Sequence, residues 1–352
     1  MKAAPVLFDT FPFSRHIESP ITPSHGINGP MSAPMVEETS ISQAVRRASA
    51  LDWLHLMRPT DWLKNLLVLA ALVFGSRLTL WTDFRAAAVA AVAFTLLSAG
   101  FYAVNDALDR ESDRDHPLKR HRPVATGAIS SAGATLFGLA LIAMGLAGGF
   151  ALSGKVGLVL IFYALLQIMY NAGLKRVALY DVATLAVGFV LRAAAGAAAI
   201  HAHISVWFML GVYFLCLYLG FIKRMADLTS ALRNGSAHWH SPAGYDDLPE
   251  LNWNAAVSAA LAMGTYLAYT LSNHAQVIFG YKALLFALLA PLVVLAMQRL
   301  YRRASQGCSD RPLDAFTQDA GFRTSILLFI AITVLMLYES HFGPWLSKYL
   351  LN

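Results

Sequence analysis

Long apolar runs separated by short polar segments make up most of this chain from residue 52 onward. A helix needs roughly 20 apolar residues to cross the hydrocarbon layer of a membrane. Windows of that length predict an all-α bundle of nine membrane-spanning helices, in which the first span is the least apolar because Lys64 and Asn65 fall in its first turn. The predicted spans are 62–82, 86–108, 132–152, 156–173, 180–200, 204–222, 254–272, 281–299 and 324–343.

Composition and charge also indicate a membrane protein. Of the 352 residues, 57% are hydrophobic and only 14% are charged, which lies outside the range of soluble domains. Lys and Arg gather in the loops after the second, fourth, sixth and eighth predicted spans, so the positive-inside rule places these loops on the cytoplasmic side of the inner membrane. The same bias accounts for most of the net charge of +6, and we expect no nucleic-acid partner.

The first 50 residues differ in composition from the rest of the chain. They mix Pro, Ser, Thr and His and contain no long apolar run. Segments of this kind bury too little apolar surface to offset the entropy lost on folding. We therefore expect a disordered cytoplasmic tail at 1–50, followed by one transmembrane domain at 51–352.

A block of charged residues follows the second predicted span. Asp106, Asp109 and Asp113 are spaced so that a continuous helix would place their carboxylates on one face, with Asn105 one turn below Asp109. Such an anionic face suits Mg²⁺ that carries a phosphorylated substrate. The alternative is an ordinary solvated loop. Ionisable clusters at the end of a span are costly and usually functional, which favours the metal site.

Cations and further polar groups surround the predicted spans. Lys119 and Arg122 follow the carboxylates and would meet phosphate oxygens that the metal leaves uncovered. Arg192 lies well inside an apolar run, where it either pairs with a structural partner on another helix or binds a substrate phosphate. Other polar residues at span ends are Arg58, Lys64, Asn65, Tyr170, Asn171, Lys175, Tyr180, Asp181, Lys223 and Arg224.

The charged block carries a resemblance to a known family. The run Asn105-Asp106-x-x-Asp109-x-x-x-Asp113, the tail His116-Pro117-x-Lys119-x-x-Arg122-Pro123 and the nine predicted spans resemble the UbiA-type intramembrane prenyltransferase superfamily over about residues 52–345. Within it, the chain resembles the branch that transfers 5-phosphoribosyl from phosphoribosyl diphosphate to decaprenyl phosphate. The segments that carry this second resemblance are Arg58-Pro59-x-x-Trp62-x-Lys64-Asn65, Asp181-Val182, Leu191-Arg192-Ala-x-x-Gly196 and Lys223-Arg224.

One departure separates the branches of this superfamily. Aromatic prenyltransferases carry a second Asp-x-x-x-Asp between spans six and seven, which holds a second metal on the prenyl diphosphate. This chain reads Lys223-Arg224-Met-Ala-Asp-Leu-Thr-Ser-Ala there, which favours the phosphoribosyl branch. Asp246 and Asp247, further along the same loop, leave room for the aromatic branch.

The resemblance implies a UbiA-like catalytic bundle that makes prenyl-phosphoryl ribose 5-phosphate for arabinose-type glycan synthesis. Mg²⁺ would be held by Asp106, Asp109 and Asp113 beside Asn105, at the cytoplasmic side. Substrate phosphates would meet Arg58, Lys64, Asn65, Lys119, Arg122, Lys175, Arg192, Lys223 and Arg224, and other substrate contacts would come from Tyr170, Asn171, Tyr180 and Asp181.

Two other classes of function stay open at this point. An aromatic or quinone-precursor prenyltransferase would use the same first motif with a prenyl diphosphate. A membrane transporter would also carry intramembrane charges, but such proteins usually show paired repeats with broken helices, and no such repeat is seen here. The expected partners are phosphoribosyl diphosphate, a polyprenyl phosphate and the membrane, and the sequence is compatible with a homo-oligomer.

Overall fold

The structure is a computed structural model that describes residues 48–75, 77–115, 119–203, 205–234, 243–308 and 312–350. Almost all of the predicted tail, and His116 and Pro117 of the charged motif, lie outside these residues. The described part of the chain is helical and contains no strand. The prediction of an all-α fold is therefore confirmed.

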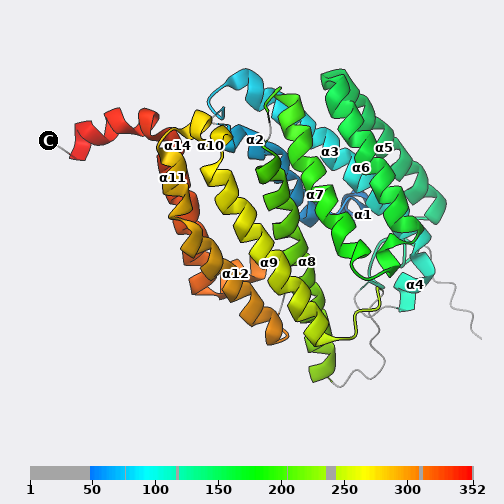
Figure 1. Ribbon diagram of the computed structural model, residues 1–352. Helices are drawn as coiled ribbons and strands as arrows, with labels where there is room; N and C mark the ends of the chain where they lie inside the picture. The colour runs from blue at the N-terminus through cyan, green and yellow to red at the C-terminus, as the bar shows by residue number, and fades with distance from the viewer. Residues whose placement is uncertain are drawn as a thin grey trace, which may run out of the picture. The chain divides into compact units, whose positions relative to one another are not determined.

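The helices follow one another as neighbours along much of the chain (Figure 1). The amino-terminal part consists of α1 (Ala50–Leu56), the 3₁₀ helix η1 (Pro59–Leu69), α2 (Ala70–Phe74), α3 (Trp81–Leu108), α4 (Arg110–Asp115), α5 (Ser131–Leu152), α6 (Gly154–Ala172), η2 (Leu174–Arg176) and α7 (Tyr180–Ala199). Here α3 packs along α5, α6 packs between α5 and α7, and η1 lies against α3 and α7.

The carboxyl-terminal part forms a second group of helices. It consists of α8 (Val206–Arg233), α9 (Leu248–Leu271), α10 (Asn273–Phe279), α11 (Lys282–Ala287), α12 (Ala290–Ser305), α13 (Pro312–Gln318) and α14 (Ala320–Leu350). Helix α8 packs against α7 on one side and against α9 and α12 on the other, so it joins the two groups. Helix α12 packs along α14.

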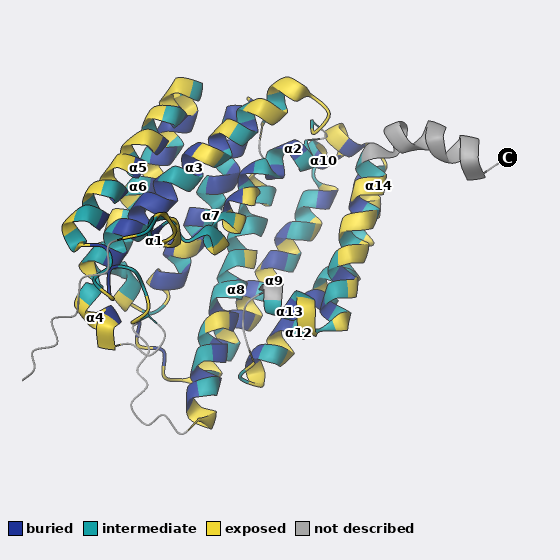
Figure 2. Cartoon of the chain, turned by 180° about the vertical axis from the view of Figure 1, so that it is seen from behind, coloured by how far each residue is buried: buried dark blue, intermediate teal, exposed yellow. Residues whose placement is uncertain are grey.

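Among the described residues, seven helical stretches are long and apolar enough to cross a membrane, with α11 and α12 together counted as one of them. The bent pair α9 and α10, whose axes meet at 56°, gives an eighth if it forms one span. Large apolar residues such as Leu136, Phe162 and Val277 are more than half exposed, where lipid would cover them. Figure 2 shows exposed residues, in yellow, along helices such as α5 and α14. The chain is a multi-pass membrane protein, but the count of nine spans is not confirmed.

The first predicted span, 62–82, is wrong as a continuous α-helix. The chain instead forms η1 and then the short α2, and it turns at Gly75. Pro59 starts η1, and the side chain of Asn65 is turned into the protein rather than toward lipid. A 3₁₀ helix rises about 2.0 Å per residue, so η1 still advances roughly 22 Å along the bundle.

Local sequence explains how the helices beside the site begin and pack. Ser130 and Ser153 cap α5 and α6 by accepting hydrogen bonds from Gly133 N (3.1 Å) and Val156 N (3.3 Å). The predicted spans 132–152 and 156–173 leave only three residues between them, and in the structure α5 and α6 form a tight hairpin, since Ser153 alone separates them. Helices α3 and α5 touch through glycines: a methyl group added at Gly100 would lie 2.5 Å from the carbonyl oxygen of Gly138.

Candidate active site

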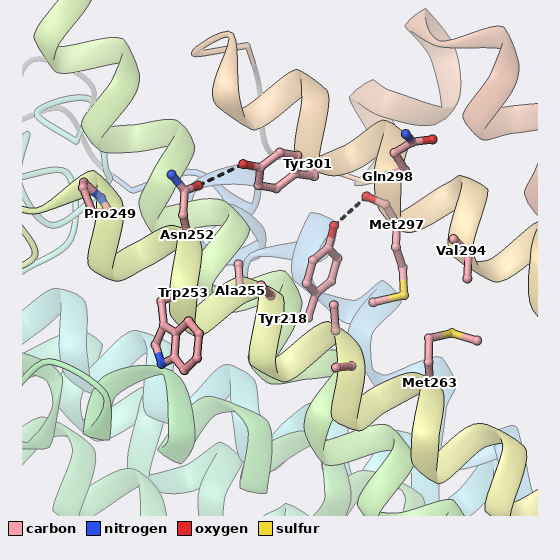
Figure 3. A pocket seen from close by; sticks show the side chains of 13 residues that line it. Tyr218, Pro249, Asn252, Trp253, Ala255, Met263, Val294, Met297, Gln298 and Tyr301 are labelled. Carbon is pink, nitrogen blue, oxygen red and sulfur yellow. Dashed lines mark hydrogen bonds between the residues drawn. The ribbon is translucent and has the colours of Figure 1, made fainter.

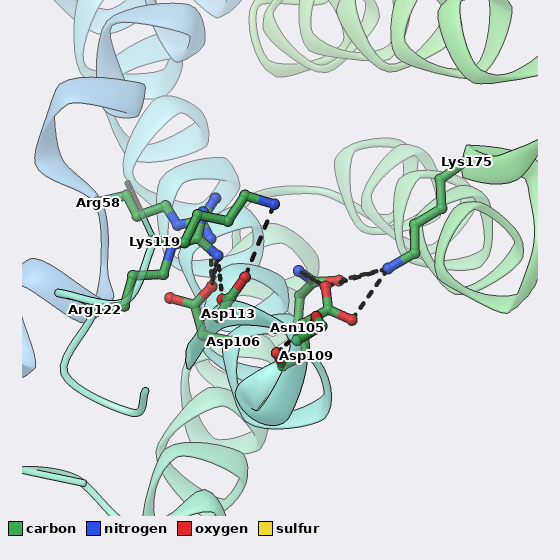
Figure 4. Close-up of polar contacts among 9 residues, drawn as sticks. Arg58, Asn105, Asp106, Asp109, Asp113, Lys119, Arg122 and Lys175 are labelled. Atoms are coloured by element: carbon green, nitrogen blue, oxygen red, sulfur yellow. Dashed lines mark hydrogen bonds and ion pairs between the residues drawn. The ribbon is translucent and has the colours of Figure 1, made fainter. Parts of the chain in front are cut away.

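Two carboxylates of the charged block meet at the end of α3. Asp106, in the last turn of α3, and Asp113, in α4, are both buried, at 3% and 2% exposed. One nitrogen of Arg122, Nη1, donates to both, at 3.0 Å from Asp106 and 2.7 Å from Asp113 (Figure 4). Lys119 Nζ lies 3.8 Å from the other oxygen of Asp113. Asp106 and Asp113 are here called the carboxylate pair, and Arg122 and Lys119 are the cations beside it.

Asp109 does not join this pair. Helix α3 ends at Leu108, and Asp109 itself (φ −88°, ψ 8°) is the non-helical residue before α4. The break turns the side chain of Asp109 away, so the three carboxylates do not share one face as a continuous helix would require. Lys175 Nζ lies 3.3 Å from Asp109 Oδ2, and Asn105 Nδ2 donates to the same oxygen at 2.9 Å.

The carboxylate pair fits a divalent cation by donor chemistry and by spacing. Asp106 and Asp113 offer hard oxygens close enough together to share one cationic atom of Arg122. Mg²⁺ is commonly held by one or two carboxylates together with substrate phosphates, rather than by an all-protein cage. Among the described residues no three His, Cys, Asp or Glu side chains converge on one point. In this structure Asp106 and Asp113 are the two carboxylates placed to share a cation.

Arg58 approaches the carboxylate pair from η1. Its Nη2 donates to Asp106 Oδ1, and its guanidinium carbon lies 4.8 Å from the centre of the Tyr102 ring. Arg58 has a left-handed backbone (φ 51°, ψ 68°), which is rare for a residue with a side chain. Strain of this kind costs about 1–3 kcal/mol and persists where the surrounding structure requires it. Here it ends α1 and starts η1 with the guanidinium aimed at Asp106.

Arg192 lies in a buried pocket of neutral groups. Its Nε donates to Asn65 Oδ1 at 2.9 Å and its Nη2 to the Tyr163 hydroxyl at 3.1 Å. The rings of Phe94, Tyr163 and Phe189 lie 5.0 to 5.1 Å from its guanidinium carbon. Asn65 in turn donates to Thr95 and Ser98 on α3. This network joins η1, α3, α6 and α7 through side chains.

The two cations at the end of α8 have different surroundings. Arg224 binds Asp181, the fully buried acid in the first turn of α7, through Nη2 at 2.7 Å and Nε at 2.9 Å. Lys223 is half exposed, and its Nζ lies 3.7 Å from Asp227 one turn further along the same helix. Arg224 is therefore tied to a carboxylate of its own.

The remaining predicted site residues lie at the edge of the candidate site or away from it. Lys64 pairs with Asp61 at 2.6 Å and is 47% exposed. Tyr170 and Asn171 are half-buried in the last turn of α6, and Tyr180 is exposed at the start of α7. No contact among the described residues brings Lys64 to the carboxylate pair.

Sequence reasoning missed three aromatic residues. Tyr102 stacks under Arg58, Tyr163 binds Arg192, and Tyr245 donates to Asp181 Oδ1 at 2.6 Å. Tyr102 and Tyr163 carry a weak signal, because each places a hydroxyl inside a long apolar run. Tyr245 stands in a polar loop and carries none.

A separate pocket of about 640 Å³ lies between α8, α9 and α12 (Figure 3). Its lining includes Tyr218, Trp253, Met263 and Met297 and contains no charged side chain. Tyr301 donates to Asn252 at 3.2 Å at one end. Without charged groups this pocket suits an apolar chain and not a phosphate, so it is no part of the candidate site.

Comparison with known families gives a match over most of the chain. Residues 66–326 match the model of the UbiA prenyltransferase family. The chain is 31% identical over 279 residues to a decaprenyl-phosphate phosphoribosyltransferase of Mycobacterium tuberculosis, which covers 78% of this chain and 90% of that protein. It is 38% identical over 185 residues to the enzyme of the same name from Mycolicibacterium smegmatis, covering 51% of this chain and 58% of that one.

Solved structures give the same fold. A UbiA homolog from Archaeoglobus fulgidus bound to DMAPP and Mg²⁺ aligns with a TM-score of 0.60 at 22% identity. The alignment covers 81% of this chain and 99% of that chain. At this identity the likeness concerns the arrangement of helices.

Proposed function

Because this chain belongs to the UbiA prenyltransferase family, we propose that it transfers 5-phosphoribosyl from phosphoribosyl diphosphate to a polyprenyl phosphate. The product is a prenyl-phosphoryl ribose 5-phosphate, and diphosphate leaves. The similarity to decaprenyl-phosphate phosphoribosyltransferases along most of their length supports this choice of donor and acceptor. Decaprenyl phosphate is the acceptor that those names indicate.

The observation that carries the proposal is the balance of charge around the carboxylates. Three acids, Asp106, Asp109 and Asp113, face four cations, which are Arg58, Lys119, Arg122 and Lys175. The cluster therefore has one positive charge in excess before any substrate binds. A diphosphate brings several negative charges, and a divalent cation on Asp106 and Asp113 would offset part of them. A site with this charge balance suits the diphosphate of a donor substrate.

The cations then have separate tasks. Arg58 and Arg122 lie on the carboxylate pair and would turn to the diphosphate oxygens when a divalent cation replaces them there. Lys175, on the other side of Asp109, lies where it would hold the second phosphate, that of the lipid acceptor. Holding two like-charged phosphates close together is the main requirement of this reaction.

The chemistry needs no strong base in the protein. A phosphate monoester is anionic at neutral pH, and its oxygen attacks the anomeric carbon while the bond from that carbon to the diphosphate breaks. Bound Mg²⁺ would stabilise the charge that builds on the leaving diphosphate. The protein orients the two substrates and excludes water, and the apolar faces of the helices accommodate the prenyl chain.

The end of α8 favours this reaction over prenyl transfer to an aromatic ring. A second metal site there would need a pair of acids, but Asp227 lies within 4 Å of Lys223 and Arg224. Asp247 accepts from Glu250 N at 3.3 Å and caps α9. The positive-inside rule favours a cytoplasmic location for this face of the bundle, which is the side where phosphoribosyl diphosphate would be available.

The experiment is a product assay on the purified protein. Labelled phosphoribosyl diphosphate, Mg²⁺ and decaprenyl phosphate should give label in the lipid fraction, whereas a prenyl diphosphate with 4-hydroxybenzoate should give no prenylated aromatic. Asp106→Ala and Asp113→Ala should each lower the rate by roughly 100-fold or more. Glu111→Ala is the matched control, since Glu111 lies in the same segment but is 76% exposed. Label that stays in the aqueous phase, with a prenylated aromatic formed, would overturn the proposal.

A further inference from the structure

Three elements meet at the buried carboxylate of Asp181. Arg224 from α8 binds one oxygen, and the Tyr245 hydroxyl from the segment before α9 donates to the other at 2.6 Å. The same Tyr245 oxygen accepts a hydrogen bond from Leu179 N at 2.7 Å. Asp181, Arg224 and Tyr245 are here called the Asp181 clasp.

The clasp provides charge and hydrogen-bond partners for polar groups whose burial would otherwise destabilise the fold. Asp181 is fully buried, so its charge needs the guanidinium of Arg224 nearby. Burial and the neighbouring carboxylate raise the pKa of the Tyr245 phenol, so its proton is retained at physiological pH and is available to Asp181. Leu179 has a positive φ (φ 68°, ψ −46°), a conformation disfavoured for a residue with a branched side chain. Tyr245 is the partner that accepts its N–H.

Leu179 is the last residue of the turn that carries Lys175. This turn is short: Arg176 N donates to Gly173 O at 2.9 Å, Val177 N donates to Leu174 O at 3.2 Å, and α7 begins at Tyr180. With so few residues between them, the position of Leu179 restricts where the Lys175 side chain can reach. Lys175 Nζ lies 3.3 Å from Asp109 Oδ2 and 3.4 Å from Asn105 Oδ1.

We propose that Tyr245 is a positioning residue, which holds the α6–α7 turn through Leu179 and Asp181 and thereby fixes Lys175 opposite Asp109. It touches no substrate. Arg224 belongs to the same clasp, so its guanidinium has a structural task at Asp181. The assignment of Lys175 to the acceptor phosphate rests on the proposed function, but the clasp itself does not.

The first test is independent of activity. Tyr245→Phe removes the acceptor of the Leu179 amide, so hydrogen exchange in the peptide covering 174–183 should become faster in the purified full-length protein. Tyr281→Phe is the matched control, because Tyr281 is 75% exposed and belongs to another part of the bundle. Asp181→Asn keeps the shape of the side chain but removes the charge, and it should speed exchange in the same peptide. Unchanged exchange in both clasp variants would overturn the proposal.

The second test uses transfer kinetics. Tyr245→Phe should lower kcat/KM by roughly 10- to 100-fold, because a misplaced Lys175 no longer holds its phosphate in line. If Tyr245 acts through Lys175, the double variant Tyr245→Phe/Lys175→Ala should match Lys175→Ala within about twofold. Losses that multiply instead would show that Tyr245 acts elsewhere and would refute the proposal. If the wild-type protein makes no phosphoribosyl lipid, the proposed function fails, and the exchange experiment alone decides on the clasp.

Discussion

Replacing Arg192 tests whether a cation in the middle of the bundle is there for structure or for substrate. Its guanidinium donates to Asn65 and Tyr163, which are neutral, and lies among three aromatic rings. Only 5% of the residue is exposed. Asn65, Phe94 and Tyr163 lie on three other segments of the bundle, η1, α3 and α6, and hold the guanidinium in place, so we expect a structural role.

The size of the effect follows from those contacts. A hydrogen bond from a charged donor contributes about 1.5–3 kcal/mol, and a buried cation over an aromatic ring adds about 0.5–2 kcal/mol. Arg192→Ala loses two such hydrogen bonds and the ring contacts, so it should destabilise the fold by roughly 3.5–8 kcal/mol. Arg192→Lys keeps the charge but not the forked donors, and we expect a loss of about 2 kcal/mol.

The assay compares thermal unfolding in detergent with substrate kinetics for each variant. Both Arg192 variants should lower the Tm and the yield of folded protein together. Arg85→Lys is the matched control, since Arg85 is exposed in the first turns of α3. The reasoning is refuted if Arg192→Lys keeps the wild-type Tm while the KM for one substrate rises, because that pattern indicates a guanidinium that binds a substrate phosphate.

Three further predictions follow from single contacts. Gly196→Ala should abolish folded protein in size-exclusion chromatography, since a methyl group there would overlap the carbonyl oxygen of Val68, whereas Gly264→Ala, with open space around it, should not. Arg224→Ala should lower the Tm far more than Lys223→Ala: losing the partner of a buried carboxylate costs about 3–5 kcal/mol, and losing a half-exposed pair costs about 0–1 kcal/mol. Chelation with EDTA should stop lipid labelling without lowering the Tm, and added Mg²⁺ should restore it; labelling that persists in EDTA would contradict a divalent cation at Asp106 and Asp113.

The arrangement of spans could largely be predicted from sequence because it depends on local counts of apolar residues. The hairpin at Ser153 is an example, since the polar link is too short for anything but a tight turn. The prediction for the segment after Pro59 was wrong because it also relied on the local count of apolar residues. Its average composition is apolar, but the tertiary partners of Asn65 stabilise a 3₁₀ helix rather than an α-helix across the membrane.

The details of the candidate site could be predicted less well, because they depend on single dihedral angles and distant partners. A break of one residue at Asp109 separates it from Asp106 and Asp113, and the spacing in the sequence does not reveal such a break. The partner of Asp181 provides another case: Tyr245 is 64 residues away and lies in a loop of ordinary polar composition. A contact between residues so far apart in the sequence depends on how the whole bundle folds, and the sequence of either segment alone does not reveal it.

The glycine contact between α3 and α5 has a consequence for engineering the enzyme. Because a methyl group at Gly138 would lie 2.7 Å from the carbonyl oxygen of Gly100, a larger residue at either position would force the two backbones apart. Helix α3 carries Asp106 of the candidate active site. The position of this site therefore depends on a helix interface in which side chains larger than glycine do not fit at Gly100 and Gly138. Mutant libraries of the enzyme should therefore keep Gly100 and Gly138 and vary helices that do not carry the carboxylate pair, such as α9 and α12.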